Sequence, residues 1–573
     1  MQFVINFINF IKRLSFLISK KNKKKSLKVL FGMIFVALVE VLSLGLIYPA
    51  IQQVLGNKVS FLNDLSFYKN LNQSDQLALI LIVIFFVFLI KNIFIILFII
   101  YKSTFMENFL SNLRKKLYNL YLNQNYKNFI DKNSPDILRN IQIETTVVMR
   151  SLDGFLNILS ELLLLVGIMV LLIFLAPAPS IIILLMCSLF FLVYVKIFKK
   201  IIFVLGKERF ELDSSLINNI NNPLGNYREI LIYNIFSFFN KKLDYTLLRL
   251  NKNLRTINVM SQSLRVIIEQ FGIIVILGLS FYFYYISGDF LSITALLGAY
   301  VYAFFKILPS LNKITLNMQA IINGKYSVEY LCNEIKRLED LQKVNLISKI
   351  NNREKFRSLK IIDLSFRLDD KYILKNINLE INANDKIGIM GESGSGKTTL
   401  LNLIMGLLEP SSGKIVLNDN NLNLQNLKHH IGFVSQSNHI MNDTLKNNVT
   451  FGQCENNDID EKKFWDSIKK SGLEEFTNNL NNKENTIINE NATNISGGES
   501  QRILIARALY FAVDVIILDE FTSALDVQTE NKILEEINQI DKTIIIVSHK
   551  KNTIKNMKKI YQIEKKTLNK IDV

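Results

Sequence analysis

The apolar positions of this 573-residue chain follow one pattern before about Leu308 and a different pattern after it. In the first part, mostly apolar stretches recur at roughly the 20-residue length that an α-helix needs to cross a bilayer. In the second part, short apolar runs alternate with amphipathic segments, which is typical of the strands and helices of an α/β domain. We therefore expect a transmembrane domain over residues 1–340, a linker over 341–354 and an α/β domain over 355–573.

Six apolar stretches of the first part predict six spanning helices. Two of them are short when apolar residues alone are counted, so we expect their helices to continue into the cytoplasm. The stretches are roughly Leu27–Val54, Leu77–Ile100, Phe155–Leu175, Ile181–Val195, Val266–Ile286 and Ile293–Leu308.

Charge in the connections predicts the orientation of these helices. The connections after the second and fourth stretches are long and basic, whereas those after the third and fifth are short and carry almost no charge. Lysine and arginine concentrate on the cytoplasmic side of membrane proteins. Both termini, the long connections and the α/β domain are therefore predicted to be cytoplasmic, in a multi-pass protein of the cell inner membrane.

Two connections carry patterns of their own. The stretch Asn128–Arg150, with Pro135, predicts a helix, a break and a second helix. In the first external connection, the apolar residues of Ser60–Asn70 recur at helical spacing. That spacing fits a short amphipathic helix on the outer membrane surface or a packed loop, and both interpretations stay open.

The chain is basic, with a formal net charge of +17 and a pI near 9.4. Six lysines between Lys20 and Lys28 directly precede the first apolar stretch. This position is typical of a cytoplasmic flank that contacts anionic lipid headgroups, so we predict membrane lipid rather than nucleic acid as the partner. The three cysteines are scattered without metal-ligand spacing, which indicates free thiols.

A phosphate-binding loop is the clearest chemical signal in the chain. Residues 391–398 match the pattern GxxxxGK[ST], after the apolar strand Lys386–Met390 and before a helix-forming run, Leu400–Leu407. The glycines let backbone N–H groups surround the phosphates of ATP, the lysine reaches the β- and γ-phosphates, and the threonine hydroxyl holds Mg²⁺. The predicted nucleotide-binding residues are Gly391, Glu392, Ser393, Gly394, Ser395, Gly396, Lys397, Thr398 and Thr399, with Thr398 also on the metal.

Two acidic residues end another apolar strand, Val515–Leu518. Downstream of a phosphate loop, Asp519 is expected to act on the metal ion, and Glu520 is expected to lie beside the γ-phosphate. There the Glu520 carboxylate can polarise the attacking water, so it is the predicted catalytic base.

A second anion site opens another helix. The segment Asn494–Glu499 offers a hydroxyl and two glycine backbones at a helix N-terminus. One ATP molecule cannot occupy two such sites of one domain, so this segment is predicted to cap a nucleotide bound to a partner subunit. The residues concerned are Ser496, Gly497, Gly498 and Glu499.

With these motifs, the second part resembles an ABC nucleotide-binding domain, and the whole chain resembles a half-transporter of the type IV ABC exporters. The fold class that this implies is a six-helix α-helical transmembrane domain followed by an α/β P-loop domain. The resemblance also implies that Gln436 contacts the γ-phosphate and the metal. It implies that His549, which follows the predicted strand Thr543–Val547, contacts the γ-phosphate. Asp526 would lie in the loop Ser523–Asp526 that crosses the dimer.

The resemblance further implies a homodimer with twelve spanning helices, or a heterodimer with a paralogue. Coupling helices are expected near Gln142–Met149 and Ile217–Asn226. Because the catalytic set of Glu520, His549 and Gln436 is intact, an active ATPase that uses ATP and Mg²⁺ is predicted.

Several positions depart from the family pattern. Ile495, Glu499 and Lys550 stand where leucine, glutamine and arginine are frequent, and these changes are mild. At the usual adenine-stacking position the chain has Leu368 instead of an aromatic residue. Either Tyr372 takes the role or the base packs on aliphatic surface.

Ionisable residues within the apolar stretches are candidates for substrate contact, because charge in lipid is costly. Lys91 and Lys306 both lie roughly 20 Å below the outer boundary, at about 1.5 Å per helical residue. In a dimer they would form a belt suited to an anionic headgroup, or they pair with Glu40 and Glu161 to hold the bundle together. Both alternatives stay open, and the full set is Glu40, Lys91, Glu161, Arg265, Glu269 and Lys306.

Two short segments, Leu38–Pro49 and Lys306–Ile314, are similar to parts of the first and sixth helices of bacterial lipid-linked oligosaccharide flippases. This implies ATP-driven export or flipping of a polyprenyl-pyrophosphate-linked oligosaccharide or a similar amphiphilic lipid. The alternative is a peptide or drug exporter. The apolar stretches argue against a soluble ATPase that acts on nucleic acid, and the intact hydrolytic residues argue against an ATP-gated channel.

Overall fold

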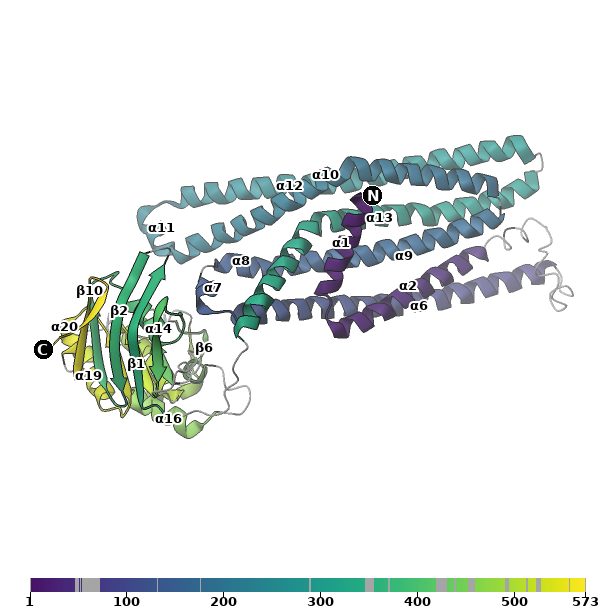
Figure 1. Ribbon diagram of the computed structural model, residues 1–573. Helices are drawn as coiled ribbons and strands as arrows, with labels where there is room; N and C mark the ends of the chain where they lie inside the picture. Colours follow the sequence, from purple (N-terminus) through teal and green to yellow (C-terminus); the bar gives the residue numbers. More distant parts are fainter. Residues whose placement is uncertain are drawn as a thin grey trace. The chain divides into compact units, whose positions relative to one another are not determined.

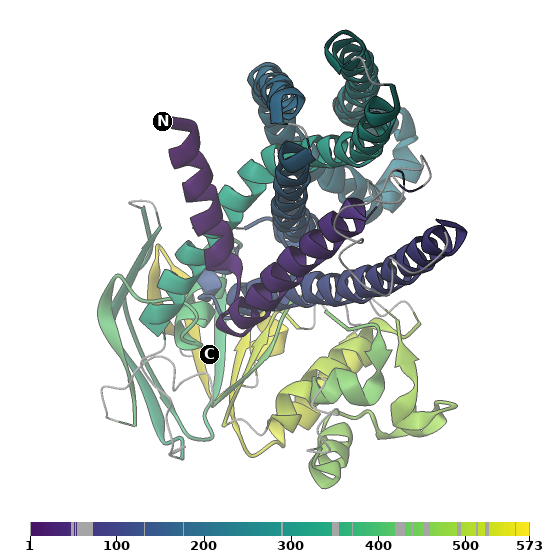
Figure 2. The same cartoon turned by 90° about the vertical axis from the view of Figure 1, so that its right-hand side faces the viewer.

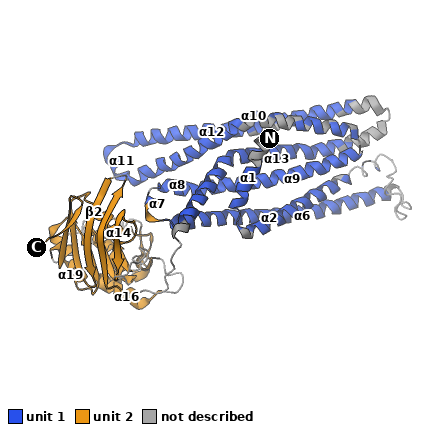
Figure 3. Cartoon of the chain, viewed as in Figure 1, with its two compact units in different colours: residues 1–124, 129–344 blue, residues 125–128, 345–573 orange. Residues whose placement is uncertain are grey.

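A computed structural model of the chain divides into two compact units (Figure 3). The first comprises residues 1–124 and 129–344, and the second comprises residues 125–128 and 345–573. The division at residue 344 falls within the expected linker. The described residues are 2–46, 51, 53, 73–130, 132–175, 177–287, 290–345, 355–368, 371–418, 430–436, 439–451, 459–489, 494–511, 514–521, 527–555 and 557–571.

Long helices build the first unit (Figure 1). Four of them have 49 to 56 residues. At 1.5 Å per residue that is roughly 75–85 Å, more than twice the ~30 Å of a bilayer core, so these helices continue beyond the membrane as expected. The long helices are α1 (Gln2–Leu17), α2 (Lys20–Gly45), α6 (Gln73–Leu122), α9 (Thr145–Leu175), α10 (Pro177–Gly225), α12 (Phe236–Ser287) and α13 (Phe290–Asn345).

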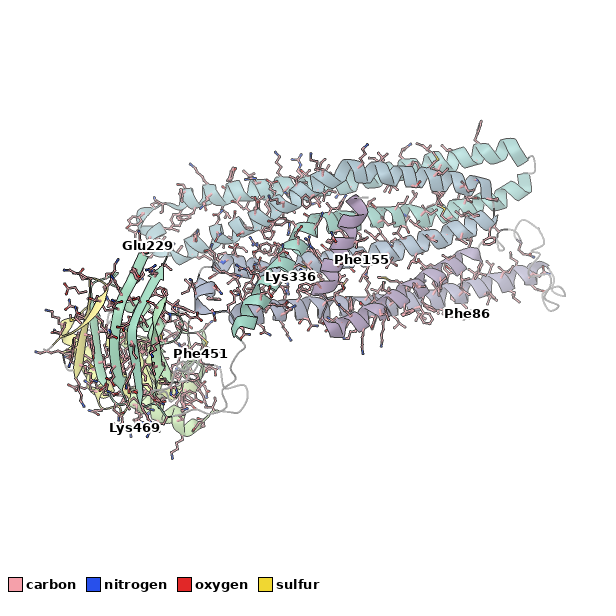
Figure 4. All side chains as sticks on the ribbon, in the orientation of Figure 1. Phe86, Phe155, Glu229, Lys336, Phe451 and Lys469 are labelled. Carbon is pink, nitrogen blue, oxygen red and sulfur yellow. The ribbon has the colours of Figure 1, made fainter. Side chains whose placement is uncertain are left out.

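Within the described residues, three stretches are long and apolar enough to cross a membrane, Asn22–Ser43, Asp75–Leu122 and Ser134–Phe174, and Val266–Gly278 is a shorter apolar helix. Large apolar side chains of α6 face outward, as Phe86 does with 55% of its surface exposed (Figure 4). The predicted spans Ile181–Val195 and Ile293–Leu308 lie in α10 and α13, in stretches where the structure leaves many side chains undescribed. The predicted surface helix at Ser60–Asn70 also lies outside them.

Short helices join the long ones. The expected helix, break and helix around Pro135 are confirmed as α7 (Tyr126–Ile130) and α8 (Ser134–Arg139), with the proline in the first turn of α8. A π-helix, η1 (Asn140–Glu144), then leads directly into α9. After α10 the chain reverses through α11 (Tyr227–Tyr233).

Neither segment in which a coupling helix was expected forms a separate helix. Gln142–Met149 is continuous with η1 and α9, and Ile217–Asn226 is the end of α10 and the N-cap of α11. The separate short helices at the chain reversals are α7, α8 and α11. Asn234 ends α11 in a left-handed conformation (φ 52°), which lets the chain turn into α12.

The N-terminal helix α1 packs on the first unit through one apolar face. Phe10, Leu14 and Leu17 are buried in a cluster with side chains of α2, α6, α9 and α13. On its polar side, Arg13 pairs with Glu329 of α13 at 2.8 Å. Lys336 of α13, labelled in Figure 4, lies 5.4 Å from the ring centroid of Phe16.

Two main sheets build the second unit. An antiparallel sheet has the order β2-β1-β4, and a six-stranded, mostly parallel sheet has the order β11-β10-β3-β9-β8-β5. The strands predicted at Lys386–Met390, Val515–Leu518 and Thr543–Val547 are confirmed. The bounds are β1 (Ser358–Leu368), β2 (Lys371–Asn382), β3 (Lys386–Gly391), β4 (Ser412–Leu417), β5 (Ile431–Val434), β8 (Val515–Asp519), β9 (Thr543–Val547), β10 (Lys559–Glu564) and β11 (Thr567–Ile571).

A group of helices in the second unit has a hydrophobic core of its own, separate from the core between the sheets. Figure 2 shows these light green helices to one side of the strands. They are α15 (Leu445–Thr450), α16 (Glu461–Lys470), α17 (Glu474–Asn479) and α18 (Gly497–Tyr510), with the small strands β6 (Asp443–Thr444) and β7 (Ile487–Ile488) and the turn η4 (Lys483–Asn485). Against the six-stranded sheet lie α14 (Lys397–Ile404), α19 (Val527–Asn538) and α20 (Lys551–Ile554).

Candidate nucleotide site

Three neighbouring parallel strands, β3, β9 and β8, bring the predicted residues to one edge of the sheet. Ile389 pairs with Val547, and Val547 pairs with Asp519, so the three strands end at the same level. The phosphate loop follows β3, His549 follows β9, and Glu520 follows β8. Ligands of open α/β sheets bind at this carboxyl edge of the strands.

The phosphate loop, residues 391–396, joins β3 to α14. Gly394 and Gly396 have φ values of 79° and 103°, a left-handed region that only glycine adopts without strain. Lys397 is the first residue of α14, so backbone N–H groups of the helix N-terminus face the loop. The buried hydroxyl of Ser395 has no hydrogen-bond partner among the described residues, which leaves a donor for a phosphate oxygen.

Glu520 is the point at which the other predicted residues meet. Its carboxylate accepts a hydrogen bond from Gln436 Nε2 at 2.9 Å. It lies 3.6 Å from Lys397 Nζ and 3.6 Å from His549 Nδ1. The backbone of Glu520 is in a left-handed conformation (φ 44°), held by its N–H, which donates to Val547 O at 2.9 Å. Non-glycine residues in this region are uncommon and cluster at functional sites.

Lys397 is buried beneath the loop. Its ammonium donates to the carbonyl oxygens of Gly391 at 2.8 Å and Glu392 at 3.0 Å. These two bonds and the nearby Glu520 carboxylate hold the ammonium group beside the loop backbone, where it can reach a phosphate bound by the loop.

Asp519 is buried at the end of β8, with 7% of its surface exposed. Burial raises the pKa of its carboxyl to about 6, the charge of Glu520 adds to this, and Lys397 opposes it. Three groups at this edge of the sheet can offer an oxygen ligand to a metal ion: the Thr398 hydroxyl, the Gln436 amide oxygen and the Asp519 carboxylate. Such a set fits Mg²⁺, which takes few protein ligands and keeps water and phosphate oxygens.

The second anion segment opens α18. Ser496 caps this helix: its hydroxyl accepts from the Glu499 N–H at 3.3 Å, and its own N–H donates to Glu499 Oε2 at 2.7 Å. This capping box gives Glu499 a structural role that glutamine also fills. Gly497 and Gly498 form the first turn of this helix. Ile503 and Ala506, further along it, are buried in the core of α15–α18. Asp526 and the rest of Ser523–Asp526 lie outside the described residues.

A cavity of about 540 Å³ adjoins the phosphate loop. Tyr372 is among the residues that line it, whereas Leu368, half exposed at the end of β1, is not. The turn between β10 and β11 also lines this cavity. No sequence motif marks that turn, which is why motif reasoning missed it.

Three of the candidate charged residues of the membrane unit, Glu40, Glu161 and Lys306, form ion pairs. Lys306 Nζ lies 3.6 Å from Glu40 Oε1, as the structural alternative expected. Glu161, however, pairs with Lys313 at 2.8 Å. Lys91 is buried, with its ammonium 4.1 Å from the ring centroid of Phe88. The side chain of Arg265 lies outside the described residues.

Comparison with known proteins matches both parts of the chain. Residues 31–308 match the family model described as ABC transporter transmembrane region, and residues 374–523 match the model described as ABC transporter. The chain is 30% identical over 370 residues to an ATP-dependent lipid A-core flippase of Francisella tularensis, an alignment that covers 60% of this chain and 58% of that protein. The chain therefore spans little more than half the length of this relative.

Two further similarities cover more of the chain. A putative export ATP-binding/permease protein of Rickettsia typhi is 27% identical over 490 residues, which is 81% of this chain and 82% of that protein. A solved structure of a bacterial Atm1-family ABC exporter with ATP bound superposes with a TM-score of 0.77, covering 95% of this chain and 94% of that one. At 17% identity this superposition shows the fold alone.

Proposed function

Since the chain belongs to the ABC transporter family, we propose that it is one half of an ATP-driven exporter or flippase. Its domain order, a helical membrane domain followed by an α/β nucleotide-binding domain, is that of the family. The proposed reaction is hydrolysis of ATP coupled to movement of an amphiphilic lipid with an anionic head. The preferred cargo is a polyprenyl-pyrophosphate-linked oligosaccharide.

The observation that carries the ATPase proposal is the convergence of Lys397, Gln436 and His549 on the Glu520 carboxylate. When ATP occupies the phosphate loop, Lys397 balances charge on the β- and γ-phosphates. Glu520 then accepts a hydrogen bond from the attacking water and orients it. Gln436 and His549 hold the Glu520 carboxylate in place, and each can also contact the γ-phosphate. Mg²⁺, held by Thr398, Gln436 and Asp519, supplies further charge neutralisation when bound.

The position of α18 supports a dimer. Its N-terminal residues Ser496–Glu499 directly follow Ile495, which packs on the core of α15–α18 and not on the core beside the phosphate loop. A helix N-terminus with two glycines suits a phosphate, and a second copy of the chain would bring one to each nucleotide. The proposed assembly is a homodimer, and a heterodimer with a paralogue is the alternative.

The proposed membrane orientation rests on the lysines between Lys20 and Lys28, which form the first turns of α2. Cations at this position hold a helix end at the cytoplasmic surface. The protein would therefore lie in the inner membrane with both termini and the nucleotide-binding unit in the cytoplasm.

Two features of the membrane unit support a lipid with an anionic head. Buried Lys91 lies near the Lys306–Glu40 ion pair and interacts electrostatically with both of its members. Two lysines and one glutamate leave this group with one excess formal positive charge. An apolar groove of about 410 Å³ lies between α9, α10 and α13, lined by Leu162 and Ile314 among others. These residues adjoin the Glu161–Lys313 ion pair in sequence. An apolar groove beside ionic groups suits an amphiphile, with its chain in the groove and its head at the charges.

The test is ATP-dependent flipping in proteoliposomes, with a labelled polyprenyl-pyrophosphate oligosaccharide as substrate and Glu520→Gln as the control. Flipping by the wild type alone is the expected result. A preparation that hydrolyses ATP but moves no glycolipid would contradict the lipid cargo and favour a peptide or drug. A preparation that folds but hydrolyses no ATP would contradict the ATPase proposal itself.

A further inference from the structure

The loop after β9 carries His549 to the nucleotide site, but packing holds the histidine side chain only in part. That side chain is 56% exposed, and its Nδ1 lies 3.6 Å from Glu520 Oε1. The position of the ring therefore depends on the backbone of the loop. Such a dependence matters for a group at a reaction centre, because a displacement of about 1 Å can lower the rate roughly 100-fold.

The residue before His549 fastens the loop to the sheet. Ser548 is buried, and its N–H donates to Ile389 O of β3 at 3.1 Å. Its hydroxyl accepts a hydrogen bond from the Lys550 N–H at 3.0 Å, which turns the backbone at His549. These two bonds fix the start of the loop.

Glu530 holds the chain on the other side of His549. This residue lies in the first turn of α19, and only 7% of its surface is exposed. Its Oε1 accepts a hydrogen bond from the Thr553 hydroxyl at 2.5 Å, and its Oε2 lies 3.5 Å from Lys550 Nζ. Lys550 directly follows the histidine, and Thr553 lies within α20. The two oxygens of one carboxylate therefore hold the segment that follows His549.

The chemistry of the two partners suits a buried carboxylate. Removing this group from water is costly unless it keeps a hydrogen-bond donor and an opposite charge. Thr553, itself buried, supplies the donor, and Lys550 supplies the charge. A lysine meets a carboxylate as a point charge, whereas an arginine tends to take both oxygens at once. Lys550 leaves Oε1 of Glu530 to Thr553, which fits a lysine at a position where arginine is frequent.

We infer that Glu530 is a positioning residue for ATP hydrolysis: by holding Lys550 and Thr553, it places His549 beside Glu520 and the γ-phosphate. This inference rests on the proposed ATPase function and adds to it a residue that acts through another. Removal of the Glu530 carboxylate should accordingly affect the contact that His549 makes, and leave the contacts of the phosphate loop unchanged.

The first test is steady-state ATP hydrolysis by the full-length transporter in detergent. Glu530→Ala removes both contacts, so its kcat should fall roughly 10- to 100-fold. Glu530→Gln can still accept from Thr553 and should lose roughly 2- to 10-fold in kcat. Glu535→Gln is the matched control, since Glu535 lies exposed on the same helix, and it should hydrolyse ATP as the wild type does. Normal kcat in Glu530→Ala would overturn the inference.

Variants of Thr553 test the same contact without emptying the space that Glu530 fills, and they serve also if Glu530→Ala does not fold. Thr553→Val removes only the hydroxyl and should lower kcat roughly 2- to 10-fold. Thr553→Ser keeps the hydroxyl and should recover most of that loss. Equal activity of the valine and serine variants would contradict the role of this hydrogen bond.

Nucleotide affinities distinguish positioning from a general loss of structure. His549 is proposed to contact the γ-phosphate, which ADP lacks. Glu530→Ala should therefore weaken ATP roughly 3- to 10-fold and leave ADP affinity unchanged. Equilibrium binding in the Glu520→Gln background, where hydrolysis is slow, makes this measurement independent of residual turnover. Equal weakening of ATP and ADP would show that Glu530 is structural only.

A double-mutant cycle with His549→Ala completes the test. His549→Ala alone should lower the ratio of ATP affinity to ADP affinity, and Glu530→Ala should lower it no further in that background, because both act on one contact. A second fall of the same size would show that the two residues act independently, which contradicts positioning. A wild-type protein that binds neither nucleotide would instead overturn the proposed ATP site, and the inference with it.

Discussion

The two units handle charge in opposite ways. In the nucleotide-binding unit, the ends of adjacent strands hold Lys397, Gln436 and His549 around a single carboxylate, Glu520. In the membrane unit, charges form pairs between helices, such as Lys306–Glu40 and Lys313–Glu161. Hydrogen bonds between paired strands fix the distances between residues at the strand ends. The distance between two charges on neighbouring helices depends instead on how each helix is rotated about its axis and shifted along it. The residues that chemistry must hold at fixed distances accordingly lie on the sheet, and the proposed contact with cargo falls to the helices.

The largest effect on activity is expected at Glu520, the carboxylate on which the charged and polar residues of the nucleotide-binding unit converge. Glu520→Gln keeps the side-chain shape but removes the base, so ATP turnover should fall roughly 10²- to 10⁴-fold while ATP still binds. Phosphate release and nucleotide binding would be measured on the same preparation. The exposed carboxylate Glu535 supplies a control, since Glu535→Gln should hydrolyse ATP normally. Wild-type turnover in Glu520→Gln would remove Glu520 as the base.

In the membrane unit, Lys91→Gln should separate transport from hydrolysis. Loss of a buried cation that meets an anionic head lowers transport roughly tenfold, while detergent-measured ATPase activity is retained. Lys306→Gln should act similarly, and the pair Lys306→Gln/Glu40→Gln shows whether an unpaired Glu40 is responsible. Normal transport by Lys91→Gln and Lys306→Gln would show that these lysines only hold the helices together.

A buried charge cluster of the membrane unit, outside its predicted membrane spans, predicts a pH effect on stability. Arg209 contacts Asp213 at 3.2 Å and Glu144 at 3.4 Å. Burial raises the pKa of Asp213 from 3.8 to about 6, and Arg209 only partly opposes this. Between about pH 4 and pH 6 the folded protein binds a proton that the unfolded chain has released. The stability that Asp213 contributes is therefore lost as the pH rises through this window.

Asp213→Asn should remove this dependence. Its unfolding temperature should exceed that of the wild type by roughly 2–4 °C at pH 7.5, with a smaller difference at pH 5. Scanning fluorimetry at the two pH values provides the measurement. Glu211→Gln, on the same helix but 66% exposed in its side chain, is the matched control and should show no such difference. An equal gain at both pH values would contradict the proton linkage.

The smallest effect is expected at Glu499, where the chain departs from the family signature. Glutamine can make the same capping box, so Glu499→Gln should change ATP turnover by less than about twofold. Glu499→Ala, which loses the bond to the Ser496 N–H, should lower the stability of the nucleotide-binding unit by about 1 kcal/mol. Thermal unfolding and ATPase assays on both variants distinguish the cap from a direct nucleotide contact.

Sequence reasoning succeeded where the signal is local. The strands before Gly391, Asp519 and His549 were predictable because each is a short apolar run that ends in a polar motif. Their meeting at Glu520 follows from parallel strand order. The left-handed backbone of Glu520 has no sequence signal, because it depends on the bond to the neighbouring strand.

The ends of the long helices and the ion-pair partners of their charged residues were harder to predict than the strands. The segments expected from the resemblance to carry coupling helices lie within η1, α9 and α10, because these helices extend further than their apolar stretches indicate. The chain reverses after α10 at α11, which Asn234 ends in a left-handed conformation. Pairing of Glu161 with Lys313 rather than with Lys91 depends on how α9 and α13 are rotated about their axes. The place of the β10–β11 turn in the lining of the cavity beside the phosphate loop depends on the fold, which brings together segments far apart in the sequence.

The length of the long helices has a mechanical consequence. A helix such as α12, with 52 residues, is a rigid rod with a hydrogen bond at nearly every residue. Tilting a rod of roughly 78 Å by about 10° around its midpoint moves each tip by roughly 7 Å. A displacement of that size is comparable to the width of a lipid headgroup. A small rotation at one tip of such a lever can thus open or close a passage at the other tip without breaking any bond along its shaft.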